Sequence, residues 1–248
     1  MRLSVKLLFC LLLLTSCKGI ELARIKNGVN NTNIKYTGFT VSYNSHTKTP
    51  NWVAWELTDI KANGSEPRAK HYKTDPNLML PQANNNDYRN SGWDRGHMAP
   101  AGDMKWSSQA MLESFYFTNI SPQNNNLNSG VWKSLEEKCR EIAKTYGRLY
   151  IICGPINNRG AFGCIGENQV SVPDAFFKVL LLKVDKDYKG VGFIFDNKAG
   201  RKPLISYTMS IDSVEQTTGI DFFYKLKKSV EKRVEERVEE AFWENLLK

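Results

Sequence analysis

The sequence predicts an α+β fold in which a mainly antiparallel central sheet is flanked by helices. Two apolar segments, 175–184 and 190–195, are joined by the tight link Asp185-Lys186-Asp187, which indicates an antiparallel hairpin. Upstream, the segment 128–146 carries apolar residues at three- and four-residue spacings, as an amphipathic helix does. Gly147 ends this helix, and the apolar segment 148–153 then predicts a buried strand.

The first seventeen residues have the pattern of an export signal. Arg2 and Lys6 precede an apolar run over 7–14, which is too short to span a membrane as a helix. Leu14-Thr15-Ser16-Cys17 resembles the bacterial lipobox, whose cysteine becomes the lipidated first residue of the mature protein. The alternative is an ordinary signal with a chance cysteine, which would leave a periplasmic or secreted protein. We expect an envelope lipoprotein, attached to a membrane only through a lipid on Cys17.

The remaining chain of about 231 residues is long enough for one domain with a sizeable core. Without the leader its formal net charge falls from +8 to about +6, which favours an anionic partner. Export permits disulfides, and Cys153–Cys164 is the first candidate, with Cys139–Cys153 as the rival pairing. An odd number of cysteines leaves at least one thiol outside such a pair.

The other elements follow in chain order, each from its local pattern. Residues 18–33 are polar and predict a tether, so residues 34–248 form the single domain. We expect strands at 36–43, 52–58 and 204–211, a long functional loop over 61–92, and a short helix over 107–115. Asp212 or Ser213 can cap a short helix that Gly219 ends, and residues 224–247 predict a charged amphipathic helix docked on the domain.

One stretch carries most of the chemistry: Asp94-Arg95-Gly96-His97-Met98-Ala99-Pro100. The Arg95 guanidinium is a planar fork that matches phosphate oxygens. His97 is one of three histidines, and an imidazole is the side chain best suited to accept a proton near neutral pH. Gly96 between them lets the backbone adopt a conformation that a side chain would forbid. A phosphate-binding group beside a base suggests attack on a phosphodiester.

The helix predicted over 128–146 supplies polar side chains for the same site. On a helical projection Asn128, Glu136 and Arg140 lie at or near the apolar side that packs on the domain. An amide and a carboxylate in that position need partners, and a hydrated magnesium ion is one candidate. Arg140 could equally form an ion pair with Glu136 or bind phosphate.

These segments together resemble the DNA/RNA non-specific endonuclease family, whose members have a ββα-metal (His-Me) finger. The resemblance covers about residues 36–224 and includes Asp94-Arg95-Gly96-His97, Thr118-Asn119-Ile120-Ser121-Pro122-Gln123, Leu127-Asn128, Leu135-Glu136, Gly154-Pro155, Val172-Pro173-Asp174 and Thr218-Gly219. Agreement of several segments in order is more specific than a single four-residue motif.

The resemblance implies a role for each site residue. His97 would be the general base that activates water, Asn128 the one direct protein ligand of Mg²⁺, and Glu136 a partner of the metal's waters. Arg95 and Arg140 would hold the scissile phosphate, while Asp94 and Asn119 would shape the site. The family also uses an upstream arginine before a segment like Lys73-Thr74-Asp75-Pro76; alignment places Lys70 there, with Arg68 nearby, so this role stays open.

The activity implied is an exported, Mg²⁺-dependent nuclease that accepts DNA and RNA and leaves 5′-phosphate ends, with Mn²⁺ as a possible substitute. Weak sequence preference is expected, because phosphate contacts position a nucleic acid without reading its bases. Two alternatives are a catalytically weak envelope lipoprotein that binds nucleic acid and a phosphodiesterase for a smaller substrate. The sequence leaves open the preference for DNA or RNA, the biological role and the oligomeric state.

Overall fold

The computed structural model describes residues 19–248 except 26–27, 158–159, 199 and 201. Its strands are β1 (Arg24–Ile25), β2 (Thr32–Lys35), β3 (Thr40–Asn44), β4 (Thr49–Thr58), β5 (Asp94–His97), β6 (Ile120–Gln123), β7 (Arg148–Ile156), β8 (Cys164–Ile165), β9 (Val170–Ser171), β10 (Ala175–Val184), β11 (Asp187–Asp196), β12 (Thr208–Met209) and β13 (Ile220–Asp221). The helices are α1 (Asp59–Ala62), α2 (Asn85–Tyr88), α3 (Ser108–Glu113), α4 (Asn125–Asn128), α5 (Val131–Tyr146), α6 (Ile211–Thr218), α7 (Lys228–Glu236) and α8 (Glu240–Leu247), with 3₁₀ turns η1 (Ala101–Met104), η2 (Phe117–Asn119) and η3 (Leu204–Tyr207).

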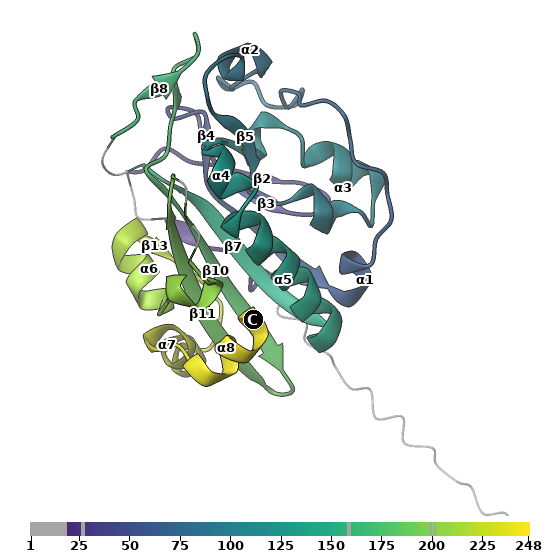
Figure 1. Cartoon of the computed structure of the whole chain (residues 1–248), viewed down its shortest axis with the longest axis vertical. Helices are drawn as coiled ribbons and strands as arrows, with labels where there is room; N and C mark the ends of the chain where they lie inside the picture. The colour runs from purple at the N-terminus through teal and green to yellow at the C-terminus, as the bar shows by residue number, and fades with distance from the viewer. Residues whose placement is uncertain (1–18, 26–27, 158–159, 199, 201) are drawn as a thin grey trace, which may run out of the picture.

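A seven-stranded sheet in the order β12-β11-β10-β7-β4-β3-β2 forms the centre of the molecule, and all its pairings are antiparallel. The α+β prediction is confirmed. Helices lie on both sides of the sheet, with α5 crossing one face and α6 and α7 packed against the region of β11 (Figure 1).

Side chains along the central strands alternate between two cores. On β4, Trp52 and Ala54 belong to the core under α6 and α7, whereas Val53, Trp55 and Leu57 belong to the core under α5. The same alternation continues on β7 and β10. Because both faces are buried, β7 and β10 are apolar at nearly every position, which is why these strands were evident in the sequence.

Several predicted elements match the structure closely. The hairpin of β10 and β11 turns between Val184 and Asp187, with Asp185 at a φ of 51°. The short helix α3 begins after Ser107, whose side chain caps it, and α6 ends at Gly219 in the left-handed conformation. The cap of α6 is Ser210 and not Asp212 or Ser213. The predicted strand over 204–211 is wrong, since η3 occupies most of it and β12 holds two residues.

The predicted helix over 128–146 is interrupted at its start. Asn128 closes the short helix α4, and α5 begins at Val131 after Gly130. A Cβ on Gly130 would lie 2.3 Å from the carbonyl oxygen of Asn126, so the chain turns here in a way that only glycine permits. Asn128 therefore reaches the site from a separate turn and not from the helix that carries Glu136.

The polar segment 18–33 was expected to be a tether, and its described part belongs instead to the folded domain. β1 pairs with β13, and β2 pairs with β3 at the edge of the main sheet. Ile20 and Ala23 are buried in the core under α6 and α7. Because the segment is polar overall, its sequence did not indicate that these few apolar side chains are buried in the domain.

The tail also differs from the single helix expected over 224–247. It forms α7 and α8, which are separated at Arg237, where φ is −152°. Val234 of α7 packs in the core on one face of the sheet, while Trp243 of α8 packs in the core on the other face. Trp243 Nε1 donates to Gly190 O at 3.0 Å. One straight helix could not reach both cores, so the tail bends around the sheet edge.

The disulfide prediction is wrong, whereas the predicted leader lies outside the described residues. Cys139, Cys153 and Cys164 are free thiols, so neither proposed disulfide forms; Cys153 and Cys139 are buried and Cys164 is exposed. The signal over 1–17, with Cys17, lies outside the described residues. Within the part of the chain that the structure describes, no helix is both long and apolar enough to cross a membrane.

Candidate active site

The Asp94-Arg95-Gly96-His97 motif forms β5, which pairs antiparallel with β6 in a two-stranded ribbon beside α4 and the start of α5 (Figure 1). His97 pairs with Ile120 and Asp94 with Gln123. Gly96 is needed here for space: a Cβ on it would lie 2.3 Å from Gln123 Oε1. The φ of Gly96 is not positive. Glycine is therefore required by close packing between the strands, and not by the unusual backbone conformation that the sequence suggested.

The His97 ring packs against aromatic side chains, and its Nε2 makes no hydrogen bond to a described residue. Its ring meets Phe115 edge-on at a centroid distance of 4.7 Å and lies 5.4 Å from Tyr72. The side chain is 8% exposed, and Nε2 has no hydrogen-bond partner among the described residues. Burial first, and then the Arg68 guanidinium, lower the pKa of His97 to about 3. The imidazole is therefore neutral at pH 7 and able to accept a proton.

Asn119 holds the chain that follows His97 and does not line the cavity. Its side-chain Oδ1 accepts from Ala99 N at 2.9 Å, and Nδ2 donates to Ala99 O at 2.9 Å and to Ser114 O at 2.8 Å. Its backbone oxygen accepts from Met98 N. This fully buried amide fixes the exit from β5, so Asn119 shapes the site through the backbone.

Asn128 and Asp94 are joined directly. Asn128 Nδ2 donates to Asp94 Oδ2 at 2.9 Å, and Asn125 Nδ2 donates to the same oxygen at 3.0 Å. With its amide nitrogen engaged in this way, the carbonyl oxygen of Asn128 has no partner among the described residues and is available as a ligand. Asp94 therefore orients Asn128.

Glu136 and Arg140 both face the same cavity but do not pair with one another. Arg140 Nη1 instead forms an ion pair with Asp103 Oδ1 at 2.9 Å, and Asp103 also accepts from Trp55 Nε1 at 3.0 Å. Gly102 allows this approach, since a Cβ there would lie 2.8 Å from Arg140 Nη1. Glu136 has no hydrogen bond to a described residue, and burial raises its pKa to about 7. Its oxygens are free for water or a cation.

Arg95 and Arg68 bring two further cations to the cavity. The Arg95 guanidinium lies over the rings of Tyr72 and Tyr88, at 5.6 and 5.3 Å from their centroids, and its buried Nε is without a partner among described residues. Arg68 lies over Phe115 at 5.0 Å. Of the two upstream candidates that the sequence left open, Arg68 lines the cavity and Lys70 does not.

The cavity has a volume of about 320 Å³ and brings five of the seven predicted site residues together. Its lining is Arg68, Tyr72, Arg95, His97, Pro100, Ala101, Gly102, Asn128, Ser129, Lys133, Glu136 and Arg140. Asp94 and Asn119 support it from behind. A second hollow of about 490 Å³ adjoins it through Arg68, Ala101, Gly102 and Arg140, and adds Lys105 and Lys144. The combined surface is strongly cationic.

Sequence reasoning missed three residues that shape this cavity. Asp103 is 1% exposed and holds Arg140, and Tyr72 packs on both His97 and Arg95. Lys178 is 1% exposed and places its ammonium 4.1 Å from the centre of the Trp132 ring, beneath the site. Asp103 follows the motif by six residues, which was the one available signal; nothing in the sequence marked Tyr72 or Lys178 as neighbours of His97.

The donor set suits a hydrated hard cation. The free carbonyl of Asn128 and the unengaged carboxylate of Glu136 are oxygen ligands, and the cavity leaves room for water. Arginine cannot ligate a cation, and His97 would remain available for proton transfer. The residues present therefore fit a metal held by Asn128, with Glu136 on its waters.

Comparison with known proteins supports this arrangement. The family described as DNA/RNA non-specific endonuclease matches residues 19–229. "Nuclease EXOG, mitochondrial" of Danio rerio is 38% identical over 210 residues, 78% of this chain and 61% of that protein. The Homo sapiens protein of the same name is 36% identical over 212 residues, 78% of this chain and 57% of that protein. The chain thus spans about three fifths of the length of these relatives.

Two further relatives are covered more fully. "Endonuclease G, mitochondrial" of Caenorhabditis elegans is 33% identical over 233 residues, 86% of this chain and 75% of that protein. A crystal structure of an EndoG/EndoGI complex superposes with a TM-score of 0.74 at 28% identity, covering 81% of this chain and 89% of that one. With the ribbon of β5 and β6, the following helices and the match over most of its length, this chain belongs to the DNA/RNA non-specific endonuclease family.

Proposed function

We propose that this chain is a metal-dependent endonuclease that hydrolyses phosphodiesters of DNA and RNA to 5′-phosphate ends. The observation that carries the proposal is a neutral His97 with an unengaged Nε2, in one cavity with Asn128, Glu136 and the three arginines. The relatives named as nucleases support the reaction class.

The chemistry follows from charge. A phosphodiester repels nucleophiles, and its displaced alkoxide is a poor leaving group. The neutral imidazole of His97 takes a proton from the attacking water, so hydroxide is generated only beside the phosphorus. Arg68, Arg95 and Arg140 take up charge on the non-bridging oxygens and orient the phosphate. Asp103 keeps Arg140 in place, and Asp94 keeps the Asn128 carbonyl turned into the cavity.

Mg²⁺, with Mn²⁺ as a substitute, would be held by Asn128 through its carbonyl and by Glu136 through bound waters. Such an ion supplies Lewis-acid stabilisation of the crowded phosphorus centre and of the departing 3′ oxygen. The arginines that line the cavity are assigned to phosphate oxygens, and phosphate contacts carry no sequence information. We expect weak sequence preference and activity on both DNA and RNA.

The second hollow extends the substrate path. Lys144 lies one helical turn beyond Arg140, about 6 Å along the axis of α5, and Lys105 directly follows η1 and lines the same hollow. Neither lysine forms an ion pair with a described residue. We expect them to contact phosphates of the strand beyond the scissile bond. Export and a lipid on Cys17 remain part of the proposal and rest on the leader sequence alone.

The test is digestion of supercoiled plasmid and of a long RNA by the purified chain lacking residues 1–17. Cleavage of both in Mg²⁺, its loss in EDTA, and 5′-phosphate ends on the products are expected. Tight binding of DNA without turnover in Mg²⁺ or Mn²⁺ would contradict the proposal and favour a nucleic-acid-binding protein instead.

A further inference from the structure

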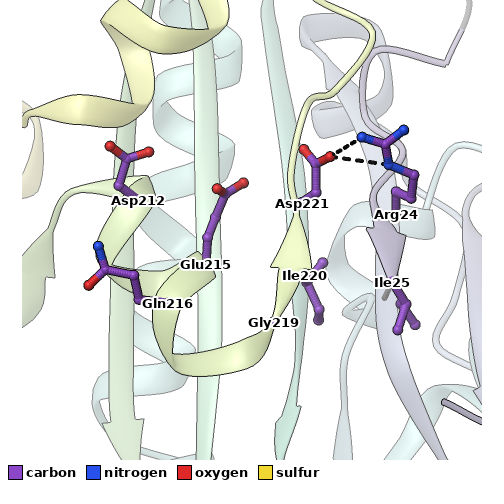
Figure 2. A pocket seen from close by; sticks show the side chains of 8 residues that line it. All are labelled: Arg24, Ile25, Asp212, Glu215, Gln216, Gly219, Ile220 and Asp221. Carbon is purple, nitrogen blue, oxygen red and sulfur yellow. Dashed lines mark hydrogen bonds and ion pairs between the residues drawn. The ribbon is translucent and has the colours of Figure 1, made fainter. Parts of the chain in front are cut away.

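A cluster of carboxylates lies where α6 meets α7, on the face of the main sheet opposite to α5. Asp212, Glu215 and Glu235 each place one carboxylate oxygen within 4.8 Å of the others. Figure 2 shows the carboxylates of Asp212 and Glu215 pointing in the same direction from α6, on the wall of a pocket of about 740 Å³. The pocket gives solvent and ions a route to these two side chains.

Two cations of this region, Arg24 and Lys228, are engaged by other carboxylates. Arg24 pairs with Asp221 across β1 and β13, as the dashed lines in Figure 2 show. Lys228 pairs with Glu231 at 2.6 Å on α7. Among the described residues, no lysine or arginine forms an ion pair with Asp212, Glu215 or Glu235. The negative charge of the cluster is therefore uncompensated by side chains.

Among the three carboxylates, that of Glu235 is buried, so the absence of a partner destabilises the folded protein most at this position. Glu235 is 5% exposed, and its Oε1 is fully buried without a hydrogen-bond partner in the described part of the chain. Burial first, and then the neighbouring charges of Glu215 and Glu231, raise the pKa of Glu235 to about 9. A buried carboxylate without a partner is destabilising, so the position implies a counter-ion or a retained proton.

We propose that Asp212, Glu215 and Glu235 bind a divalent cation, Ca²⁺, which joins α7 to α6. Ca²⁺ accepts several carboxylates in flexible geometry and completes its shell with water, whereas Mg²⁺ is usually held by one or two carboxylates. Glu215 is already oriented for this role, because its Oε1 accepts from Phe222 N at 2.7 Å. The family match ends at residue 229, so the cation would secure a tail segment that lies beyond the matched domain.

The test measures Ca²⁺ binding calorimetrically and thermal unfolding of EDTA-treated protein at neutral pH. An Asn128→Ala background removes the ligand in the nuclease cavity, so any Ca²⁺ effect that persists there comes from elsewhere. We expect one bound Ca²⁺ and a rise in Tm of roughly 5–10 °C at 100 times the Kd. Glu235→Gln should abolish both, while the exposed Glu236→Gln on the same helix should retain both.

Glu235→Gln keeps the volume of the side chain and is neutral without needing a proton or a cation, so it should fold at least as well as the parent without Ca²⁺. With Asn128 intact, the nuclease activity of Glu235→Gln in Mg²⁺ should match that of Glu236→Gln. This comparison separates the Ca²⁺ proposal from the nuclease proposal. No Ca²⁺ binding at neutral pH, or the same Tm rise in Glu235→Gln as in the parent, would overturn the proposal. Either result would leave a retained proton as the means by which the cluster is neutralised.

Discussion

Asn128 Nδ2 donates a 2.9 Å hydrogen bond to Asp94 Oδ2, which links the first residue of β5 to the end of α4. The bond spans the two halves of the site, the strand that carries His97 and the turn before the helix that carries Glu136. It fixes which end of the Asn128 amide faces the cavity. Asp94, which the sequence marked only as shaping the site, therefore acts as the positioning residue for the proposed metal ligand.

Asp94→Asn tests this role directly. The neutral side chain keeps the volume but can present an amide nitrogen to Asn128, so the carbonyl loses its fixed direction. We expect the Mg²⁺ concentration for half-maximal plasmid cleavage to rise about 10- to 100-fold, with activity largely restored at saturating metal. The exposed Asp59→Asn is the matched control. An unchanged metal requirement with a reduced maximal rate would contradict the positioning role.

The contributions of Arg140 and Asp103 to the free energy of unfolding should depend on one another. Asp103 is 1% exposed, and loss of its guanidinium partner leaves a buried carboxylate uncompensated. We expect Arg140→Gln to lower the free energy of unfolding by about 3–5 kcal/mol in urea titrations. Asp103→Asn combined with Arg140→Gln should cost less than the sum of the single changes. Simple additivity would mean that the pair contributes little.

His97 should make a measurable contribution to the pH dependence of stability. Its folded-state pKa of about 3 lies below the unfolded value of 6.5, so between these values the unfolded chain binds the extra proton. Stability is therefore lost as pH falls from about 7 toward 3. Urea unfolding of metal-free protein at several pH values should show a shallower loss in His97→Gln than in the parent. Parallel curves would show that His97 titrates normally.

Lys105 and Lys144 should contribute to polymer binding through their charges. Removing one phosphate-binding charge reduces the slope of log K against log salt by about 0.9 for duplex DNA. In a His97→Ala background, which prevents cleavage, Lys105→Ala with Lys144→Ala should lower that slope by about 2. Lys183→Ala with Lys186→Ala removes the same charge from the β10–β11 hairpin and should leave the slope unchanged. Equal effects of the two pairs would indicate only a general charge effect.

The sequence predicted the fold best where burial imposed a simple pattern. β10 was placed at its observed bounds, because both of its faces are buried and every position from Ala175 to Leu182 is buried. The site residues were found because their order along the chain resembles a family. Gly130 was the exception: the apolar periodicity continued across it, so Asn128 was assigned to a helix that begins three residues later.

The remaining differences arise from tertiary contacts. Trp243 reaches Gly190 O across the sheet edge, which breaks the tail into α7 and α8, although the i+4 stripe predicts one helix. Asp103 replaced Glu136 as the partner of Arg140, since η1 brings it under α5. Such pairings depend on which elements meet in space, and a single sequence does not contain that information in its local patterns.

The role of His97 as the base is tested most directly by chemical rescue of His97→Ala with imidazole in plasmid cleavage. We expect a loss of about 10²- to 10⁴-fold in rate for this variant, with partial recovery as neutral imidazole is added in Mg²⁺. The parent enzyme should not be accelerated by imidazole. Undiminished cleavage by His97→Ala would contradict the assignment of His97 as the base, and so would a folded variant that imidazole fails to restore.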